Sequence, residues 1–346
     1  MIGPEQLAAG LRAETAGDYV AAAAAFRAIL DAPDMSVAAQ AQFSLGRVCW
    51  RQGRYEAALG AFESARALAE RTGDDELRAQ VSNGVGAVYY ARHEYAAARE
   101  AYADAAARTN DETMSAKVLL NLGVIENVEG NLTGALSHYE RAFRIFERSG
   151  DRASATLALH NRGMVQADLH LWDDADASFL GALTLATDSG NPEMVAKTLV
   201  NRSEVLVERG AFTDAVAHCD RALDIYANMG EEVGRGEALR WRAHALGRAG
   251  DHQQAERDAT EALHIANRCG ARLLEAESAR AVGVLRGLLG DRAGGIKQLR
   301  NALALFTELG EKREAKEVGA LLQRPTPARS LQRIVPDPES TGSEPD

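Results

Sequence analysis

The chain is poor in aromatic residues, which make up 5% of its 346 residues, although 46% of them are hydrophobic. A core of this composition depends on alanine and leucine, which suits closely packed helices. Proline is also scarce: of the 8 prolines, only Pro4, Pro33 and Pro192 precede residue 324. Each of the three stands where a helix could begin, a position that tolerates proline. These shortages favour an all-α chain.

The sequence has only 3 cysteines, Cys49, Cys219 and Cys269, and no CxxC spacing. We interpret them as thiols packed among helices in a reducing compartment. No apolar run approaches the roughly 18 residues of a membrane span. The first residues lack the basic start and apolar core of a signal peptide. We therefore expect a cytoplasmic protein without a membrane partner.

Basic residues are outnumbered, with 39 lysines and arginines against 50 acidic residues, for a formal net charge of −11. This balance argues against nucleic acid as a partner, since nucleic acid selects a concentrated basic face. The 8 histidines form no HExxH motif or zinc-ligand spacing, and no GxSxG or phosphate-cradling GxxxxGK[ST] occurs. We expect no catalytic residue, no metal site and no cofactor.

What the sequence does contain is a repeated helical hairpin, seen most clearly in residues 112–150. Two segments there have apolar residues at steps of three and four, the period of a helix with one buried face. The two segments are joined at Gly130-Asn131 and the second ends at Gly150-Asp151. A single hairpin of this kind is stable only when it is stacked on further copies.

Two series of turn residues mark these copies. The turns within hairpins are separated by 36, 40, 37 and then four times 40 residues, at Gly17, Gly53, His93, Gly130, His170, Gly210, Gly250 and Gly290. The turns between hairpins fall at Gly73, Asn110, Gly150, Gly190, Gly230, Gly270 and Gly310. We expect glycine and asparagine there to supply the left-handed backbone that ends a helix.

This register predicts a repeat domain over residues 1–323. Eight hairpins occupy 4–310, at about 4–31, 35–72, 75–109, 112–149, 152–189, 192–229, 232–269 and 272–309. A helix over 311–323 is expected to cap the last hairpin, because terminal repeats need a polar outer face. Residues 324–346 hold five prolines and no helical period, so we expect a disordered tail.

Aligning the hairpins on their turns reveals columns of small and aromatic residues. Seven residues before the turn stand Gly10, Gly46, Gly86, Gly123, Gly163, Ser203, Ala243 and Gly283. Five after it, seven of eight hairpins have alanine, and nine after it stand Phe26, Phe62, Tyr102, Tyr139, Phe179, Cys219, Ala259 and Leu299. This pattern resembles the tetratricopeptide repeat, although the period near 40 exceeds the family's usual 34 and resembles its long-repeat subgroup.

The resemblance implies a right-handed superhelix, an α-solenoid, whose first helices line a concave groove. It also implies a protein that binds peptides or proteins, and it gives no reason to expect catalysis. We therefore predict a non-enzymatic scaffold or adaptor that is a monomer or a weak homo-oligomer. Two alternatives stay open: a sensor that responds to a peptide and controls a separate effector, and a self-assembling structural module.

Three asparagines, Asn121, Asn161 and Asn201, recur once per hairpin two residues before the small position. An amide can pair with both backbone groups of an extended peptide, so these residues are candidates for peptide binding. The competing interpretation is that each asparagine only joins neighbouring helices. Four residues before Asn121 and Asn201 stand Lys117 and Lys197.

Together the lysines and asparagines resemble four of the five places of the carboxylate clamp found in chaperone-binding members of the family. Asn201 stands where that clamp has arginine, so a bidentate contact to a carboxylate is missing. We favour a more general groove for anionic or backbone groups. Further groove candidates are Arg47, Arg51, Val124, Met164 and Trp241, the last as an aromatic anchor.

Overall fold

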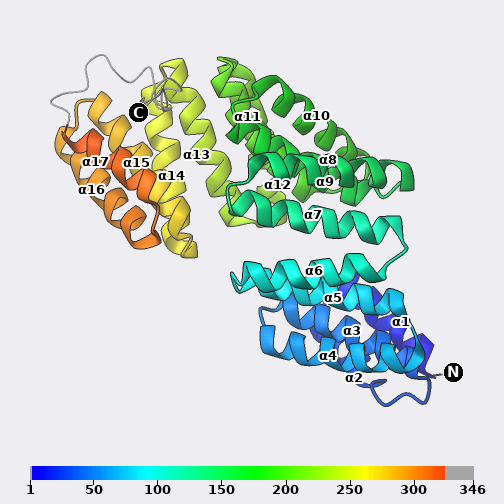
Figure 1. Ribbon diagram of the computed structural model, residues 1–346. Coiled ribbons are helices and arrows are strands. Elements are labelled where there is room, and N and C mark those ends of the chain that lie inside the picture. Colours follow the sequence, from blue (N-terminus) through cyan, green and yellow to red (C-terminus); the bar gives the residue numbers. More distant parts are fainter. Residues whose placement is uncertain (1, 324–346) are drawn as a thin grey trace, which may run out of the picture. The chain divides into compact units, whose positions relative to one another are not determined.

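The computed structural model describes residues 2–323, and the predicted tail at 324–346 lies outside the described residues. Within 2–323 the chain forms seventeen α-helices and no strand, as the sequence predicts. Contacts among the described residues divide it into two compact units: unit 1 ends at Leu169 and unit 2 begins at His170. Figure 1 shows each unit as a stack of antiparallel helices.

Unit 1 holds nine helices, each of which packs on its neighbour in sequence. They are α1 (Ile2–Thr15), α2 (Tyr19–Arg27), α3 (Met35–Arg51), α4 (Tyr55–Thr72), α5 (Asp75–Ala91), α6 (Tyr95–Arg108), α7 (Glu112–Val128), α8 (Leu132–Ser149) and α9 (Arg152–Asp168).

Unit 2 repeats the arrangement with eight helices. They are α10 (Trp172–Asp188), α11 (Pro192–Glu208), α12 (Phe212–Met229), α13 (Glu232–Ala249), α14 (His252–Cys269), α15 (Arg272–Leu288), α16 (Arg292–Leu309) and α17 (Lys312–Gln323). The helix predicted at the end of the repeats is α17, which packs on α16.

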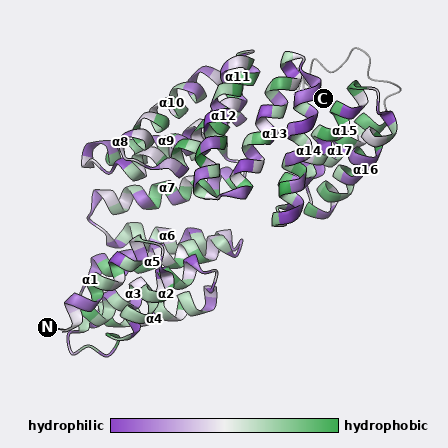
Figure 2. Ribbon diagram, turned by 180° about the vertical axis from the view of Figure 1, so that it is seen from behind, coloured by the Kyte–Doolittle hydropathy of each residue, from purple (hydrophilic) through white to green (hydrophobic). Residues whose placement is uncertain are grey.

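The two helices of a hairpin differ in their neighbours. We call the first helix of each hairpin, with an odd number, the A helix and the second the B helix. Successive A helices contact one another in both units: α1, α3, α5, α7 and α9 in unit 1, and α11, α13 and α15 in unit 2. Each unit is therefore an α-solenoid with a layer of A helices and a layer of B helices. Figure 2 shows hydrophobic and hydrophilic residues alternating around single helices, as amphipathic packing requires.

A glycine on the A helix faces an aromatic ring on the B helix in several hairpins. A β-carbon added to Gly46, Gly86 or Gly123 would lie 2.5–2.6 Å from a ring carbon of Phe62, Tyr102 or Tyr139, respectively. Where the A helix has Ser203 instead, the B helix has Cys219, whose thiol donates to the serine hydroxyl at 3.3 Å. The predicted small column is thus matched in volume by the predicted aromatic column of the same hairpin.

The turns follow the predicted register with one exception. His93 and His170 adopt positive φ angles of 62° and 58° at the positions where the other hairpins have glycine. The left-handed conformation that we predicted for Asn110 is wrong, because α6 is only 14 residues long and ends at Thr109 in an extended conformation. The Thr109 hydroxyl donates to Glu76 and accepts from the backbone N–H of Asp111. This shorter helix accounts for the spacing of 37 at that point.

Ion pairs join several B helices to the next A helix. In unit 1 they include Arg92 with Glu56, Arg99 with Glu126 and Glu129, and Arg162 with Glu140. In unit 2 they include Arg202 with Asp176, Arg242 with Asp220, and Arg286 with Glu256. The arginine lies on the A helix in all of these except at the α6–α7 junction, where Arg99 lies on the B helix. The predicted arginine column at 162, 202 and 242 thus makes ion pairs.

We expect Gly123→Ala to lower the free energy of unfolding by about 1–3 kcal/mol, because its β-carbon would overlap Tyr139. Gly60→Ala is the matched control. Gly60 is an exposed residue of α4, and a β-carbon added there meets nothing within 4 Å. We expect that control to raise the free energy by about 1 kcal/mol. Urea unfolding followed by circular dichroism measures both, and equal effects at the two sites would contradict the packing described here.

Candidate functional site

Polar pairs between successive A helices occupy many of the predicted groove positions. They are Glu14 with Arg47, Asn83 with Asn121, Glu208 with Arg248, Arg240 with Glu277, and Arg280 with Glu317 on α17. We call the side of the A helices that carries these residues the A face. A polar side chain on the A face therefore has a structural task in addition to any contact with a ligand.

Arg47 illustrates this double role. Its guanidinium forms an ion pair with Glu14 of α1 and lies 5.3 Å from the ring centre of Phe43. Arg51, one turn further along α3, is exposed and lies 5.9 Å from the ring centre of Trp50. The charge of Arg47 is thus already neutralised within the chain, whereas Arg51 is presented to solvent.

The amide of Asn121 is engaged between helices. Its Nδ2 donates to Asn83 Oδ1 on α5 at 2.9 Å, which is the structural role that competes with peptide binding. A side-chain amide has two N–H donors and an acceptor oxygen, so one hydrogen bond does not exhaust it. Asn161, the corresponding residue of α9, is partly buried.

Two exposed apolar stripes lie beside these asparagines. On α7, Lys117, Asn121, Val124 and Val128 follow one another at steps of four, three and four residues, and so share one side of the helix. On α9, which contacts α7, Leu157, Asn161 and Met164 do the same. Val128 is 49% exposed, and Leu157 and Met164 are each 39% exposed.

We call Val124, Val128, Leu157 and Met164 the apolar patch of unit 1. The sequence analysis identified Val124 and Met164 but missed the other two. Leu157 occupies the same column as Lys117 and Lys197, and Val128 lies seven residues after Asn121, so the register contained the signal.

In unit 2 the predicted site residues make contacts within the chain. Lys197 forms an ion pair with Glu193 of its own helix at 2.6 Å, and Asn201 is partly buried on α11. Trp241 of α13 packs against the core formed by α10, α11 and α12. The guanidinium of Arg240 lies 4.6 Å from the centre of the Trp241 ring, a cation–π contact. The ring of Trp241 is therefore partly covered by its own chain.

His244 lies beside Trp241, with ring centres 5.4 Å apart. Its Nε2 is inaccessible to solvent and has no hydrogen-bond partner among the described residues. Burial lowers the pKa of His244 to about 3, and the positive charges of Arg240, Arg248 and Arg280 contribute to the shift. The imidazole is thus held neutral.

The carboxylates around this histidine show the opposite shift. Burial raises the pKa of Glu277, and the attraction of Arg240 opposes that effect only in part. Burial likewise raises the pKa of Glu208, against the attraction of Arg248. The A face of unit 2 is therefore a tightly packed charged network, in contrast to the apolar patch of unit 1.

No group of three or more potential metal ligands occurs among residues 2–323. Within the same range, no helix has the length and apolar content needed to cross a membrane.

Family models described as tetratricopeptide repeat match residues 37–111 and 86–150. The chain is a tetratricopeptide repeat protein. The same hairpin geometry continues through the helices beyond the matched residues. Among curated proteins, a segment of 134 residues is 28% identical to the regulatory protein AfsR of Streptomyces griseus. That match covers 39% of this tetratricopeptide repeat protein but only 14% of AfsR.

Solved structures with the same fold span almost the whole chain. RapI in its apo form matches with a TM-score of 0.69 and 16% identity, over 93% of this chain and 96% of RapI. A Rap protein complexed with competence and sporulation factor matches with a TM-score of 0.61 and 13% identity, over 92% and 96%. A STAND protein with a tetratricopeptide repeat sensor from Pyrococcus horikoshii matches at 0.69 and 14%, over 86% of this chain and 47% of that protein.

Acidification is expected to destabilise the charged network through His244. The unfolded histidine, with a pKa near 6.5, binds a proton that the folded residue binds only near pH 3. The free energy of unfolding therefore falls as the pH drops below about 6.5, by roughly 2 kcal/mol at pH 5 from this residue.

Urea unfolding of His244→Gln between pH 5 and 8 should show a weaker pH dependence than the unsubstituted chain shows. His264→Gln changes an exposed histidine of α14 and is the control. Parallel pH profiles for the unsubstituted chain and His244→Gln would contradict the assignment.

Proposed function

We propose that this tetratricopeptide repeat protein is a non-enzymatic adaptor whose A face in unit 1 binds an extended segment of a partner protein. The apolar patch is the observation that carries the proposal. Partly exposed valine, leucine and methionine side chains on two adjacent helices give a partner apolar surface to cover, at about 25 cal/mol per Å² of area removed from water.

The polar groups beside the patch supply orientation. Asn121 and Asn161 lie on the same stripes as the apolar residues, and the exposed Lys117 lies one turn before Asn121. In this proposal the amides pair with the backbone of the segment while Lys117 attracts an acidic group. In unit 2, a separate candidate binding site for the partner consists of Asn201, Lys197 and Trp241.

Two of the similar proteins have names that support a role in binding or regulation. One of the similar structures is a Rap protein in complex with competence and sporulation factor, and AfsR is named a regulatory protein. These names also favour a second candidate function, a sensor that controls an effector when a segment binds. A sensor requires that the bound segment changes the affinity for the effector, whereas a passive adaptor does not.

Leu157→Asp/Met164→Asp should remove partner binding, because it places charge in the contact. Loss of two anchors of about 1–2 kcal/mol each corresponds to a decrease in affinity of roughly 30- to 1,000-fold. Partners captured from the native cytosol by the unsubstituted chain are identified by mass spectrometry, and their affinities are then measured with purified proteins.

Val20→Asp is the matched control, because Val20 is 77% exposed on the B helix α2 of the same unit. It should retain every partner. Partners that bind the double variant and the control equally would show that the apolar patch is not the site.

Asn161→Ala tests the amide separately from the apolar contact. We expect a five- to tenfold weaker affinity for the same purified partner, since a hydrogen bond contributes about 1 kcal/mol. An unchanged affinity would leave this asparagine with only a structural role.

A further inference from the structure

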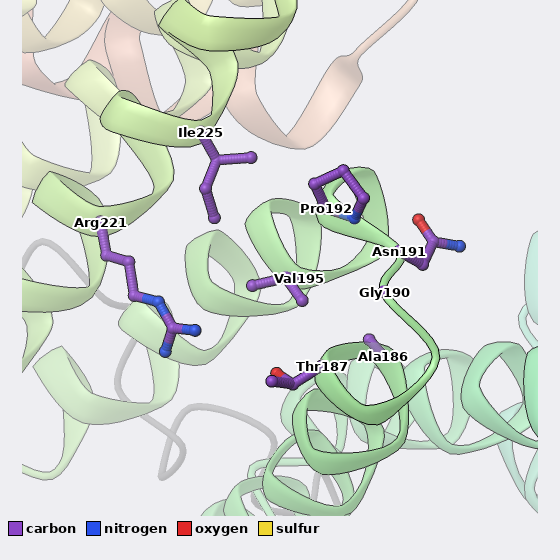
Figure 3. A pocket seen from close by; sticks show the side chains of 8 residues that line it. All are labelled: Ala186, Thr187, Gly190, Asn191, Pro192, Val195, Arg221 and Ile225. Atoms are coloured by element: carbon purple, nitrogen blue, oxygen red, sulfur yellow. The ribbon is translucent and has the colours of Figure 1, made fainter.

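A pocket of about 300 Å³ lies in unit 2, and none of its lining residues belongs to the proposed binding site. It is a shallow depression that is open to solvent, lined by the end of α10, the start of α11 and the middle of α12. Figure 3 shows Arg221 and Ile225 extending from α12 toward Val195 and Thr187. Ala186 and Val195 are buried, so the pocket has an apolar floor with an arginine at its side.

Arg221 differs from the arginines that join neighbouring hairpins. Throughout residues 2–323, no carboxylate lies within ion-pair distance of its guanidinium, and the residue is exposed. An arginine beside an apolar pocket is therefore available to an acid from elsewhere.

The next hairpin shows what fills the equivalent space. Forty residues after Val195 and Arg221 stand Arg235 and Glu261, and their side chains form an ion pair at 3.1 Å. Arg235 also pairs with Glu232 at 3.1 Å. At α11 and α12 the smaller Val195 leaves this space open and Arg221 unmatched. The pocket is thus suited to an aliphatic side chain followed closely by a carboxylate.

The chain itself contains such a segment. Residues 324–346 lie outside the described part, but their sequence includes Ile334-Val335-Pro336-Asp337, two aliphatic side chains followed by an acid. Ten residues lie between Gln323 and Ile334, and the eleven steps from one Cα atom to the next span at most about 38 Å when extended. Between α11 and α17 lie three successive A-helix spacings, each of roughly 10 Å. Gln323 also lies at the far end of α17, about 17 Å along the helix axis from the level at which α11 begins. The direct path is therefore roughly 34 Å, which a nearly extended linker spans.

We propose that Ile334–Asp337 docks in this pocket, with an aliphatic side chain against Val195 and Ile225 and the Asp337 carboxylate on Arg221. Tethering makes the docking intramolecular, so its extent is independent of protein concentration. The proposal uses B-helix residues and the start of α11, so it does not depend on the function proposed for the A face of unit 1.

Limited trypsin digestion of the full-length chain tests the docking, because Arg333 directly precedes the segment. The rate of cleavage after Arg333 is followed by mass spectrometry. Arg221→Glu and Asp337→Arg should each accelerate this cleavage at least about fivefold, since each removes an attraction of about 1 kcal/mol and adds a repulsion. The double variant Arg221→Glu/Asp337→Arg should restore the slow rate, because it re-forms the pair with reversed charges.

Arg141→Glu is the control, since Arg141 is exposed and occupies the equivalent position of α8 in unit 1. It should leave the rate unchanged, and the rate should be independent of protein concentration. The proposal is overturned if the single variants cleave at the original rate, or if the double variant remains fast. Faster cleavage upon dilution would also overturn it, because the segment would then dock between copies.

Discussion

The close approach of the two helices in a hairpin is the constraint on which the other features depend. Gly46, Gly86 and Gly123 each leave room for the ring of an aromatic residue on the partner helix, and even one methyl group would fill that room. Ser203 with Cys219 meets the same requirement with two small side chains. Because each match lies within one hairpin, a change of size on one helix is absorbed by the other helix of the same hairpin.

This packing leaves the A face to polar and exposed residues, and the two units use it differently. In unit 2, Arg240, Arg248 and Glu277 are drawn into pairs between helices around the neutral His244. A ligand there would have to compete with these internal pairs, at the cost of desolvating charges. In unit 1, Val128 and Met164 have no such task, and covering them removes apolar area from water.

The sequence predicted the helices and their register because turns and small residues recur at a fixed spacing. It placed His93 and His170 in turns, where both have positive φ. It failed at Asn110, because the length of α6 depends on the hydrogen bond between Thr109 and Glu76 and not on the residue at the turn.

The sequence also selected Asn121 and Arg47 as site residues but gave no sign of their partners Asn83 and Glu14. Contacts between adjacent A helices join residues more than 30 positions apart. The apolar patch was half predicted, and the pocket beside Arg221 was not predicted, because an empty space depends on what neighbouring side chains leave unfilled.

The reversed ion pairs between α6 and α7 distinguish this junction from the other junctions between hairpins. At the other junctions described, the acid lies on the B helix and the arginine on the next A helix, whereas α6 offers Arg99 to the glutamates of α7. Moving the α7–α8 hairpin behind α4 would set Glu126 and Glu129 against a helix whose junction residue, Glu56, is also acidic. Repulsion between like charges would penalise that arrangement, so a chain of nearly equivalent hairpins carries a local marker against being assembled in the wrong sequence.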